Sequence, residues 1–206
     1  MSGAVARTRI KFCGLTRPED VRHAVDLGVD FIGFNLAKGP RRIDLDHAVD
    51  LAAVIPTGIA IVALFVDASD EVILTSCARL RGAVAQLHGQ ESPDQAQRLR
   101  VRVPVIKAFA VRSAADLAAV RAYPCDLALL DATVGDGGTG HAWDYTQATD
   151  LGRPVMLAGG LTAERVGAAI TAVRPYAVDV SSGIEAGTPG VKDLARMRAF
   201  VAAVRG

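Results

Sequence analysis

The chain has 206 residues, of which 50% are hydrophobic and 22% are charged, and its formal net charge at pH 7 is +1. This composition excludes a disordered chain and predicts one compact domain over residues 1–206. The small net charge, without a basic run, argues against nucleic acid or an anionic membrane as partner, and no apolar stretch approaches the ~20 residues of a transmembrane helix.

Short apolar runs rich in valine and isoleucine recur along the chain, and each is followed by a polar loop and a segment of helical periodicity. The runs are continuous rather than alternating, which is typical of parallel strands buried on both faces. The eight predicted strands are residues 9–14, 30–36, 58–67, 83–89, 103–111, 125–132, 154–161 and 176–184.

Helix signals stand between these strands. Pro18 opens an amphipathic segment that Gly28 stops. Residues 92–95 have the form of a capping box, and Thr162 is placed to cap a helix with one apolar stripe. We expect the last helix around residues 191–204.

Eight strand and helix pairs without a composition break predict an α/β fold of the single-domain (β/α)8 TIM-barrel type. Short loops would account for a length below the ~250 residues typical of that fold. The alternative is an open doubly wound sheet, but that fold usually carries a glycine fingerprint after its first strand, and the sequence lacks one.

In such barrels, functional residues gather at the carboxyl ends of the strands. The sequence places chemically active types there and contains no cluster of residues with metal-ligand spacing, so we expect no metal site. The predicted strand-end residues are Cys13, Asn35, Asp67, His88, Lys107, Phe109, Asp131, Gly159, Gly160, Ser181, Ser182 and Gly183.

The last two strand ends have the composition of a phosphate cradle. Gly159 and Gly160 precede a helix, and Ser181, Ser182 and Gly183 bring two hydroxyls beside a glycine. Glycines let backbone N–H groups approach a phosphate, and a helix N-terminus favours an anion. Tight turns would also explain the glycines, but two such loops where barrels commonly bind phosphate favour a phosphate site.

Cys13 and Asp131 end strands on opposite sides of the predicted mouth, where they could flank a substrate. A thiol serves as a base when a positive environment stabilises its thiolate, and a carboxyl group can serve as an acid. A core role for Cys13 is the competing interpretation. Cys77 and Cys125 are not predicted to face the mouth, and an odd number of cysteines argues against a disulfide framework.

Seven motifs, in this order, resemble the phosphoribosylanthranilate isomerase family over nearly the whole chain. They are KFCGLTRPEDV, GPRRI, QLHG, LLDA, GGTGHAWDY, LAGGLTAERV and DVSSGIEAGTPGVKD. The resemblance implies a (β/α)8 barrel of tryptophan biosynthesis that isomerises N-(5-phosphoribosyl)anthranilate to 1-(2-carboxyphenylamino)-1-deoxyribulose 5-phosphate. It also implies an Amadori rearrangement that needs neither cofactor nor metal.

The resemblance assigns roles to residues of this chain. Cys13 matches the general base and Asp131 the general acid, which are the residues that strand position alone singles out. Arg41 matches the arginine that binds the anthranilate carboxylate, and Arg42 is the alternative because this loop is one residue shorter than the usual family form. His88 matches a pocket position and is interpreted as a substrate-binding residue.

Two other classes stay open from the sequence. Another phosphosugar barrel enzyme, such as an epimerase or aldolase, would share the phosphate loops but would not require Cys13, Arg41 and Asp131 together. A non-catalytic binding barrel would tolerate losses at these positions. We expect a small-molecule phosphosugar as partner, a monomer or homodimer, and a cytoplasmic protein because the start lacks a secretory h-region. The glycine-rich segment before Trp143 is interpreted as a lid or a mobile surface loop.

Overall fold

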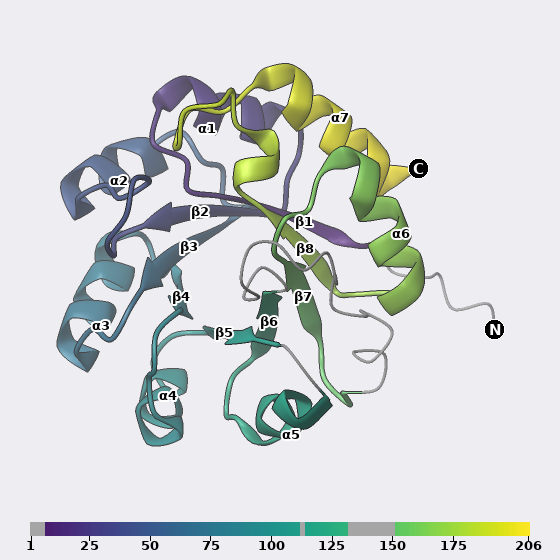
Figure 1. Cartoon of the computed structure of the whole chain (residues 1–206). Coiled ribbons are helices and arrows are strands. Elements are labelled where there is room, and N and C mark those ends of the chain that lie inside the picture. The colour runs from purple at the N-terminus through teal and green to yellow at the C-terminus, as the bar shows by residue number, and fades with distance from the viewer. Residues whose placement is uncertain (1–6, 112–113, 132–150) are drawn as a thin grey trace.

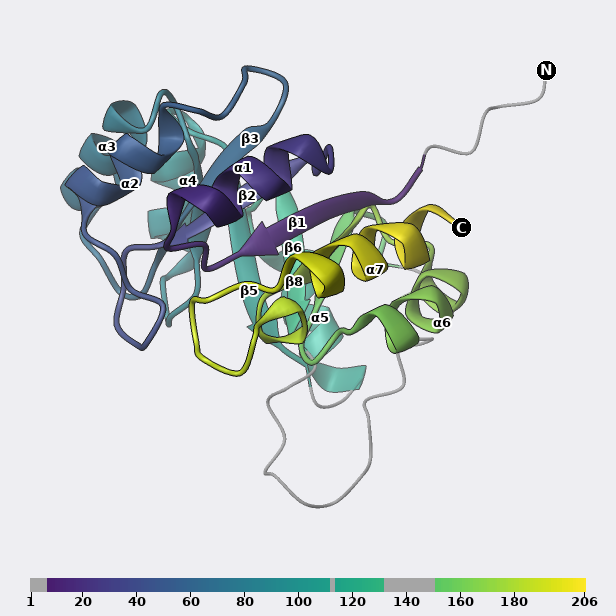
Figure 2. The same cartoon turned by 90° about the horizontal axis from the view of Figure 1, so that it is seen from above.

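The structure is a computed structural model that describes residues 7–111, 114–131 and 151–206. Eight parallel strands form a closed barrel in chain order, and β8 pairs with β1 to complete it. The helices surround this barrel, as Figure 1 shows, and Figure 2 gives the view turned by 90°. The predicted (β/α)8 barrel is confirmed, and the open doubly wound sheet is excluded.

All eight predicted strands are present, each within its expected range but shorter at one or both ends. They are β1 (Arg9–Cys13), β2 (Phe31–Asn35), β3 (Ala60–Phe65), β4 (Val84–Leu87), β5 (Val105–Ala110), β6 (Leu127–Asp131), β7 (Val155–Ala158) and β8 (Ala177–Val180).

Helices follow the strands on the outside of the barrel. Those described are α1 (Pro18–Asp26), α2 (Leu45–Ala52), α3 (Asp70–Arg79), α4 (Pro93–Arg100), α5 (Ala114–Ala122), α6 (Ala163–Val173) and α7 (Leu194–Arg205). The helix expected after the sixth strand and the segment interpreted as a lid before Trp143 lie outside the described residues.

The last two predicted strands extend too far toward their carboxyl ends. β7 stops at Ala158 because Gly159 and Gly160 take positive φ angles of 92° and 62°. These angles break the extended conformation. β8 stops at Val180, and the following residues form a short 3-10 helix, η2 (Ser182–Ile184). The phosphate-type residues therefore lie in turns rather than in strands.

Ser92 and Thr162 both take their predicted N-cap positions, but of the two only the Ser92 side chain caps its helix. The Ser92 hydroxyl accepts a hydrogen bond from the backbone N–H of Gln95 at 3.2 Å, as an N-cap should. The Gln95 side chain does not close a capping box, because it donates to the carbonyl of Ala68 instead. Thr162 occupies the N-cap position of α6, but its side chain makes no capping hydrogen bond.

Two apolar clusters lie on the two faces of the sheet. Along β6, Leu127 and Leu129 belong to the cluster inside the barrel, whereas Ala128 and Leu130 belong to the larger cluster between strands and helices. This alternation follows from the two-residue period of a strand. By the same alternation Lys11 and Cys13 of β1 point into the barrel, since Phe12 packs in the outer cluster.

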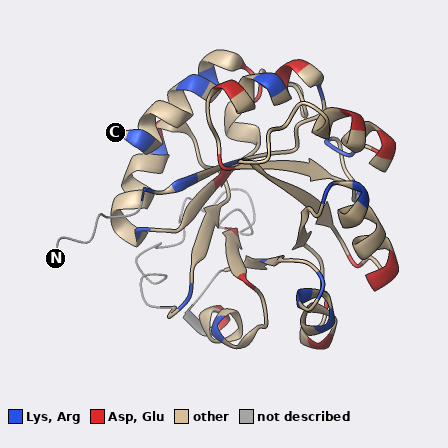
Figure 3. Cartoon of the chain, turned by 180° about the vertical axis from the view of Figure 1, so that it is seen from behind, with Lys and Arg blue, Asp and Glu red and all other residues tan. Residues whose placement is uncertain are grey.

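Charged side chains gather on the helices and loops, whereas the strands carry few of them (Figure 3). None of the helices in the described part of the chain has the length and apolarity that crossing a bilayer requires. The few charges in the strands are therefore the exceptions that call for a partner or a function.

The difference between the two caps leads to a prediction about stability. Ser92→Ala should lower the free energy of unfolding by about 1 kcal/mol, because the first turn of α4 loses its hydrogen-bond acceptor. Thr162→Ala, the matched control, should have a clearly smaller effect. Chemical denaturation of both variants measures this, and equal losses would contradict the assignment of the caps.

Candidate active site

A cavity of about 270 Å³ opens at the carboxyl ends of the strands. Most of the residues predicted for a site line it, although they come from distant parts of the chain. These are Cys13, Arg41, His88, Asp131, Gly159, Gly160, Ser181 and Ser182, and Asn35 lines it as well. The pocket is thus preformed at the carboxyl ends of the strands, where barrels of this fold carry their active sites.

Cys13 ends β1 at the centre of this cavity, with 7% of its surface exposed. Burial raises the pKa of its thiol, whereas the nearby Lys11 ammonium acts in the opposite direction. The next residue, Gly14, has a φ of 67°, and its missing side chain makes room for Arg41. The thiol therefore faces the pocket from a buried strand end, with Arg41 packed against the residue that follows it.

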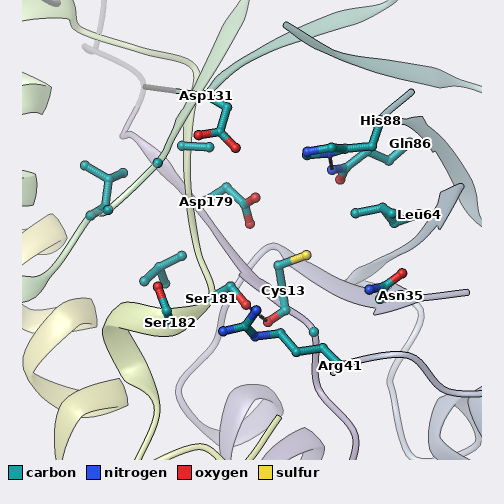
Figure 4. Close-up of a pocket in the computed structure, with 16 residues that line it drawn as sticks. Cys13, Asn35, Arg41, Leu64, Gln86, His88, Asp131, Asp179, Ser181 and Ser182 are labelled. Carbon is teal, nitrogen blue, oxygen red and sulfur yellow. Dashed lines mark hydrogen bonds between the residues drawn. The ribbon is translucent and has the colours of Figure 1, made fainter. Parts of the chain in front are cut away.

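Asp131 and His88 lie on opposite sides of the cavity, and the Cys13 thiol points toward the space between them (Figure 4). His88 Nδ1 lies 3.0 Å from the amide nitrogen of Gln86. Burial lowers the pKa of His88, which favours the neutral form of its ring. When the Gln86 amide donates to Nδ1, the ring proton is placed on Nε2, which makes His88 a hydrogen-bond donor.

Arg41 reaches the cavity from the loop between β2 and α2. Asn35 shapes this loop, because its side chain accepts from the backbone N–H of Ala37 and donates to the carbonyl of Lys38. The guanidinium binds Glu185 through two hydrogen bonds of 2.7 Å, from Nε and from Nη2. Arg42 is exposed and does not line the cavity, so of the two arginines it is Arg41 that reaches the pocket.

Glu185, in the loop after β8, connects that loop with Arg41 from the loop after β2, on the other side of β1. It also accepts from Lys192 Nζ at 2.9 Å and from the backbone N–H of Gly190 at 2.8 Å. Burial alone would raise the pKa of Glu185, but these donors lower it to about 2. Lys192 in turn donates to the carbonyl oxygen of Ser181 at 3.0 Å. The loop is thus held by charged hydrogen bonds that persist at neutral pH.

The turns after β7 and β8 lie against each other. A Cβ on Gly183 would come within 2.0 Å of the carbonyl oxygen of Leu161, so only glycine fits there. Gly159 and Gly160 line the cavity ahead of α6, whose N-terminus adds a favourable dipole for an anion. Gly183 does not line the cavity; its missing side chain lets the two turns approach each other closely.

Three residues expected at the mouth lie elsewhere. Lys107 and Phe109 share the orientation of Val105 on β5, whose side chain packs on the helix side of the barrel. Lys107 is paired with Glu91 at 2.9 Å, and Asp67 accepts from the backbone N–H of Gln90 at 2.6 Å. Lys107 and Phe109 point away from the cavity because a strand alternates its side chains between two faces, whereas Asp67 follows the end of β3 and supports the loop at Gln90.

The sequence reasoning missed three polar residues of the barrel interior. Gln86 and Asp179 line the cavity, and Lys11 lies beneath it, 3.0 Å from Asp179. Each stands inside an apolar run, and a buried polar side chain in such a run requires a partner, so the signal was present in the sequence. The carbonyl oxygen of the Gln86 side chain is buried without a hydrogen-bond partner among the described residues.

The described residues contain no group of three or more histidine, cysteine or acidic side chains that could hold a metal ion. Cys13, Cys77 and Cys125 are all buried free thiols. Burial raises the pKa of Cys77 to about 12, and neither Cys77 nor Cys125 lines the cavity. Cys13 therefore differs from the other cysteines in its access to the pocket.

A closed barrel with a polar pocket at the carboxyl ends of its strands defines a (β/α)8 protein with an enzyme-type site. The family model described as N-(5'phosphoribosyl)anthranilate (PRA) isomerase matches residues 10–203. The chain belongs to this family.

Individual relatives agree with this assignment. The N-(5'-phosphoribosyl)anthranilate isomerase of Chromohalobacter salexigens is 44% identical over 216 residues, which cover 99% of this chain and 97% of the relative. A structure of phosphoribosyl anthranilate isomerase in complex with reduced 1-(o-carboxyphenylamino)-1-deoxyribulose 5-phosphate has a TM-score of 0.88 and 33% identity, covering 97% and 99% of the two chains. Monomers generated from the dimeric isomerase of Thermotoga maritima give a TM-score of 0.86 and 34% identity with the same coverage.

Proposed function

We propose that this protein isomerises N-(5-phosphoribosyl)anthranilate to 1-(2-carboxyphenylamino)-1-deoxyribulose 5-phosphate in tryptophan biosynthesis. The observation that carries this function is the convergence of Cys13, Asp131 and Arg41 with the two glycine and serine turns on one cavity, in a chain of this family. A phosphosugar epimerase or aldolase would not need these three side chains together.

The cavity supports an Amadori rearrangement by acid and base catalysis. Asp131 donates a proton to the ribose ring oxygen, and the sugar opens to a Schiff base. Cys13, as thiolate, then removes the proton from C2, and the resulting enolamine tautomerises to the ketose. Each positioned proton transfer contributes ~10² to 10⁴ in rate. The two groups suit these roles because they approach the cavity from different strands, β1 and β6.

The two ends of the substrate carry negative charge, and the cavity offers a separate site for each. The phosphate binds at Gly159, Gly160, Ser181 and Ser182, where backbone N–H groups and hydroxyls can surround it. The anthranilate carboxylate binds Arg41. Since Nε and Nη2 of that arginine are engaged by Glu185, Nη1 is the group that turns to the substrate.

His88 binds the substrate rather than transferring a proton in this scheme. Its neutral ring donates from Nε2 to a ribose oxygen, because Gln86 occupies the other nitrogen. Gly183 contributes indirectly, because its missing side chain lets the phosphate turns pack closely. The reaction uses no cofactor or metal. We further propose that residues 1–206 act as one cytoplasmic domain, as a monomer or a homodimer.

The function is tested by mixing the pure protein with freshly prepared phosphoribosylanthranilate and following the loss of anthranilate-type fluorescence. The wild type should turn the substrate over. Cys13→Ser, which keeps the shape but is far harder to ionise, should reduce kcat by ~10² or more because proton abstraction fails. Cys125→Ser is the control and should retain turnover. Near-normal kcat in Cys13→Ser would remove Cys13 as the base.

Arg41→Ala should weaken binding of the reduced product analogue by roughly 1.5 to 3 kcal/mol, because a charge-assisted contact is lost. Glu185 keeps Lys192 and Gly190 as partners, so the loop should remain folded. Arg42→Ala is the matched control, and its affinity should equal that of the wild type. Calorimetric titration measures both variants. The reverse order of effects would move the carboxylate site to Arg42.

Asp131→Asn should lower kcat by ~10² to 10⁴, because asparagine keeps the shape but cannot deliver the proton that opens the ring. Affinity for the product analogue should change little. Wild-type turnover in Asp131→Asn would rule out Asp131 as the acid, and His88 would be examined next.

A further inference from the structure

Beneath the Cys13 thiol, the barrel interior holds a buried ion pair that the mechanism above does not use. Lys11 has no exposed surface, and its Nζ lies 3.0 Å from Asp179 Oδ1. The two residues are register partners on β1 and β8, so the pair bridges the strands that close the barrel. Burying two charges costs desolvation energy, and either charge alone would be strongly destabilising there, so the presence of this pair calls for an explanation.

The ammonium and the thiol border the same small space. Cys13 is the register partner of Gly33 on β2. A Cβ on Gly33 would lie 3.0 Å from the Cys13 sulfur and 3.2 Å from Lys11 Nζ. The glycine thus leaves the room in which the two groups approach each other. Lys11 therefore lies between Asp179 on one side and the thiol on the other.

Other charged groups near the thiol are already paired. Lys192 from the loop after β8 and Arg41 from the loop after β2 both bind Glu185. Asp131 and His88 face Cys13 from β6 and from the end of β4, on the far sides of the cavity (Figure 4). Lys11 is the cation that reaches the thiol from within its own strand.

We propose that Lys11 is a positioning residue for the base: its ammonium stabilises the Cys13 thiolate, and Asp179 holds the ammonium in place. The catalytic role of Lys11 rests on the proposed function. A nearby positive charge is needed because burial raises the pKa of the Cys13 thiol and so disfavours the thiolate that proton abstraction requires. The charge of Lys11 acts against that effect.

The test is the ionisation of Cys13 in the free protein, followed by the ultraviolet absorbance of the thiolate with Cys13→Ser as blank. Lys11→Met keeps the length of the side chain and removes its charge. It should raise the pH at which Cys13 ionises by about one to three units, the effect of losing a nearby opposite charge. Alkylation by iodoacetamide, resolved by peptide mass, should slow in parallel and distinguishes Cys13 from Cys77 and Cys125.

Asp179→Asn should have the opposite sign, because the thiolate then becomes the nearest anionic partner of Lys11 and ionises at lower pH. Lys107→Met is the matched control. Lys107 is also buried and paired with a carboxylate, Glu91 at 2.9 Å, but it lies outside the cavity. In this control variant, Cys13 should ionise at the same pH as in the wild type, even if the substitution lowers the stability of the protein.

Turnover gives a second readout. Lys11→Met should lower kcat at neutral pH with a small change in KM, and raising the pH should restore part of the rate, which a merely structural role would not predict. An unchanged titration in folded Lys11→Met, or shifts of the same sign in Lys11→Met and Asp179→Asn, would overturn the proposal.

If Lys11→Met does not fold, the double variant Lys11→Gln with Asp179→Asn keeps a hydrogen-bonded pair without charge. Its thiol should ionise at higher pH than that of Asp179→Asn alone, because only the charge of Lys11 differs between the two, and equal values would refute the role of Lys11. The titration needs no substrate. A failure of the isomerase assay would therefore be distinguishable from a failure of this pairing.

Discussion

Closure of the sheet between β8 and β1 is the constraint on which the rest of the site depends. The register of this last pairing sets Lys11 beside Asp179 and so places two opposite charges together inside the barrel, where neither would be stable alone. Cys13 follows two residues later on the same face of β1. A slip of one residue in this pairing would turn the thiol toward the helices and separate the ion pair.

Strands and loops make different contributions to the cavity. Cys13 and Asp131 are held at strand ends, whose positions the barrel fixes, whereas Arg41 comes from a loop that Asn35 and Glu185 shape. Proton transfer requires the more accurate placement, and rigid elements supply it. Binding of a flexible, doubly charged substrate tolerates loop residues, provided that charged hydrogen bonds hold them.

The sequence predicts the barrel well, because continuous apolar runs and intervening helical stripes are local signals. It also predicts the pocket positions of Cys13 and Asp131, since position at a strand end suffices. Prediction from the sequence fails where a side chain's direction depends on the alternation along a strand, or where its partner is distant in the chain. Lys107 is expected at the mouth, but its side chain points to the helices. Thr162 occupies the N-cap position of α6, but its side chain does not cap the helix. The partnership of Lys11 with Asp179 joins residues from opposite ends of the chain and becomes visible only when the barrel closes.

The segment after β8 has a consequence for the design of new substrate specificity. Ser181 and Ser182 line the part of the cavity proposed to bind the phosphate, while Glu185 in the same segment orients the arginine proposed for the aromatic acid. One stretch of backbone thus governs both recognition elements. Replacing this segment to admit a different aromatic group would therefore also disturb binding of the sugar phosphate. Exchange of the β2 loop, with Glu185 retained as its anchor, is the more independent route.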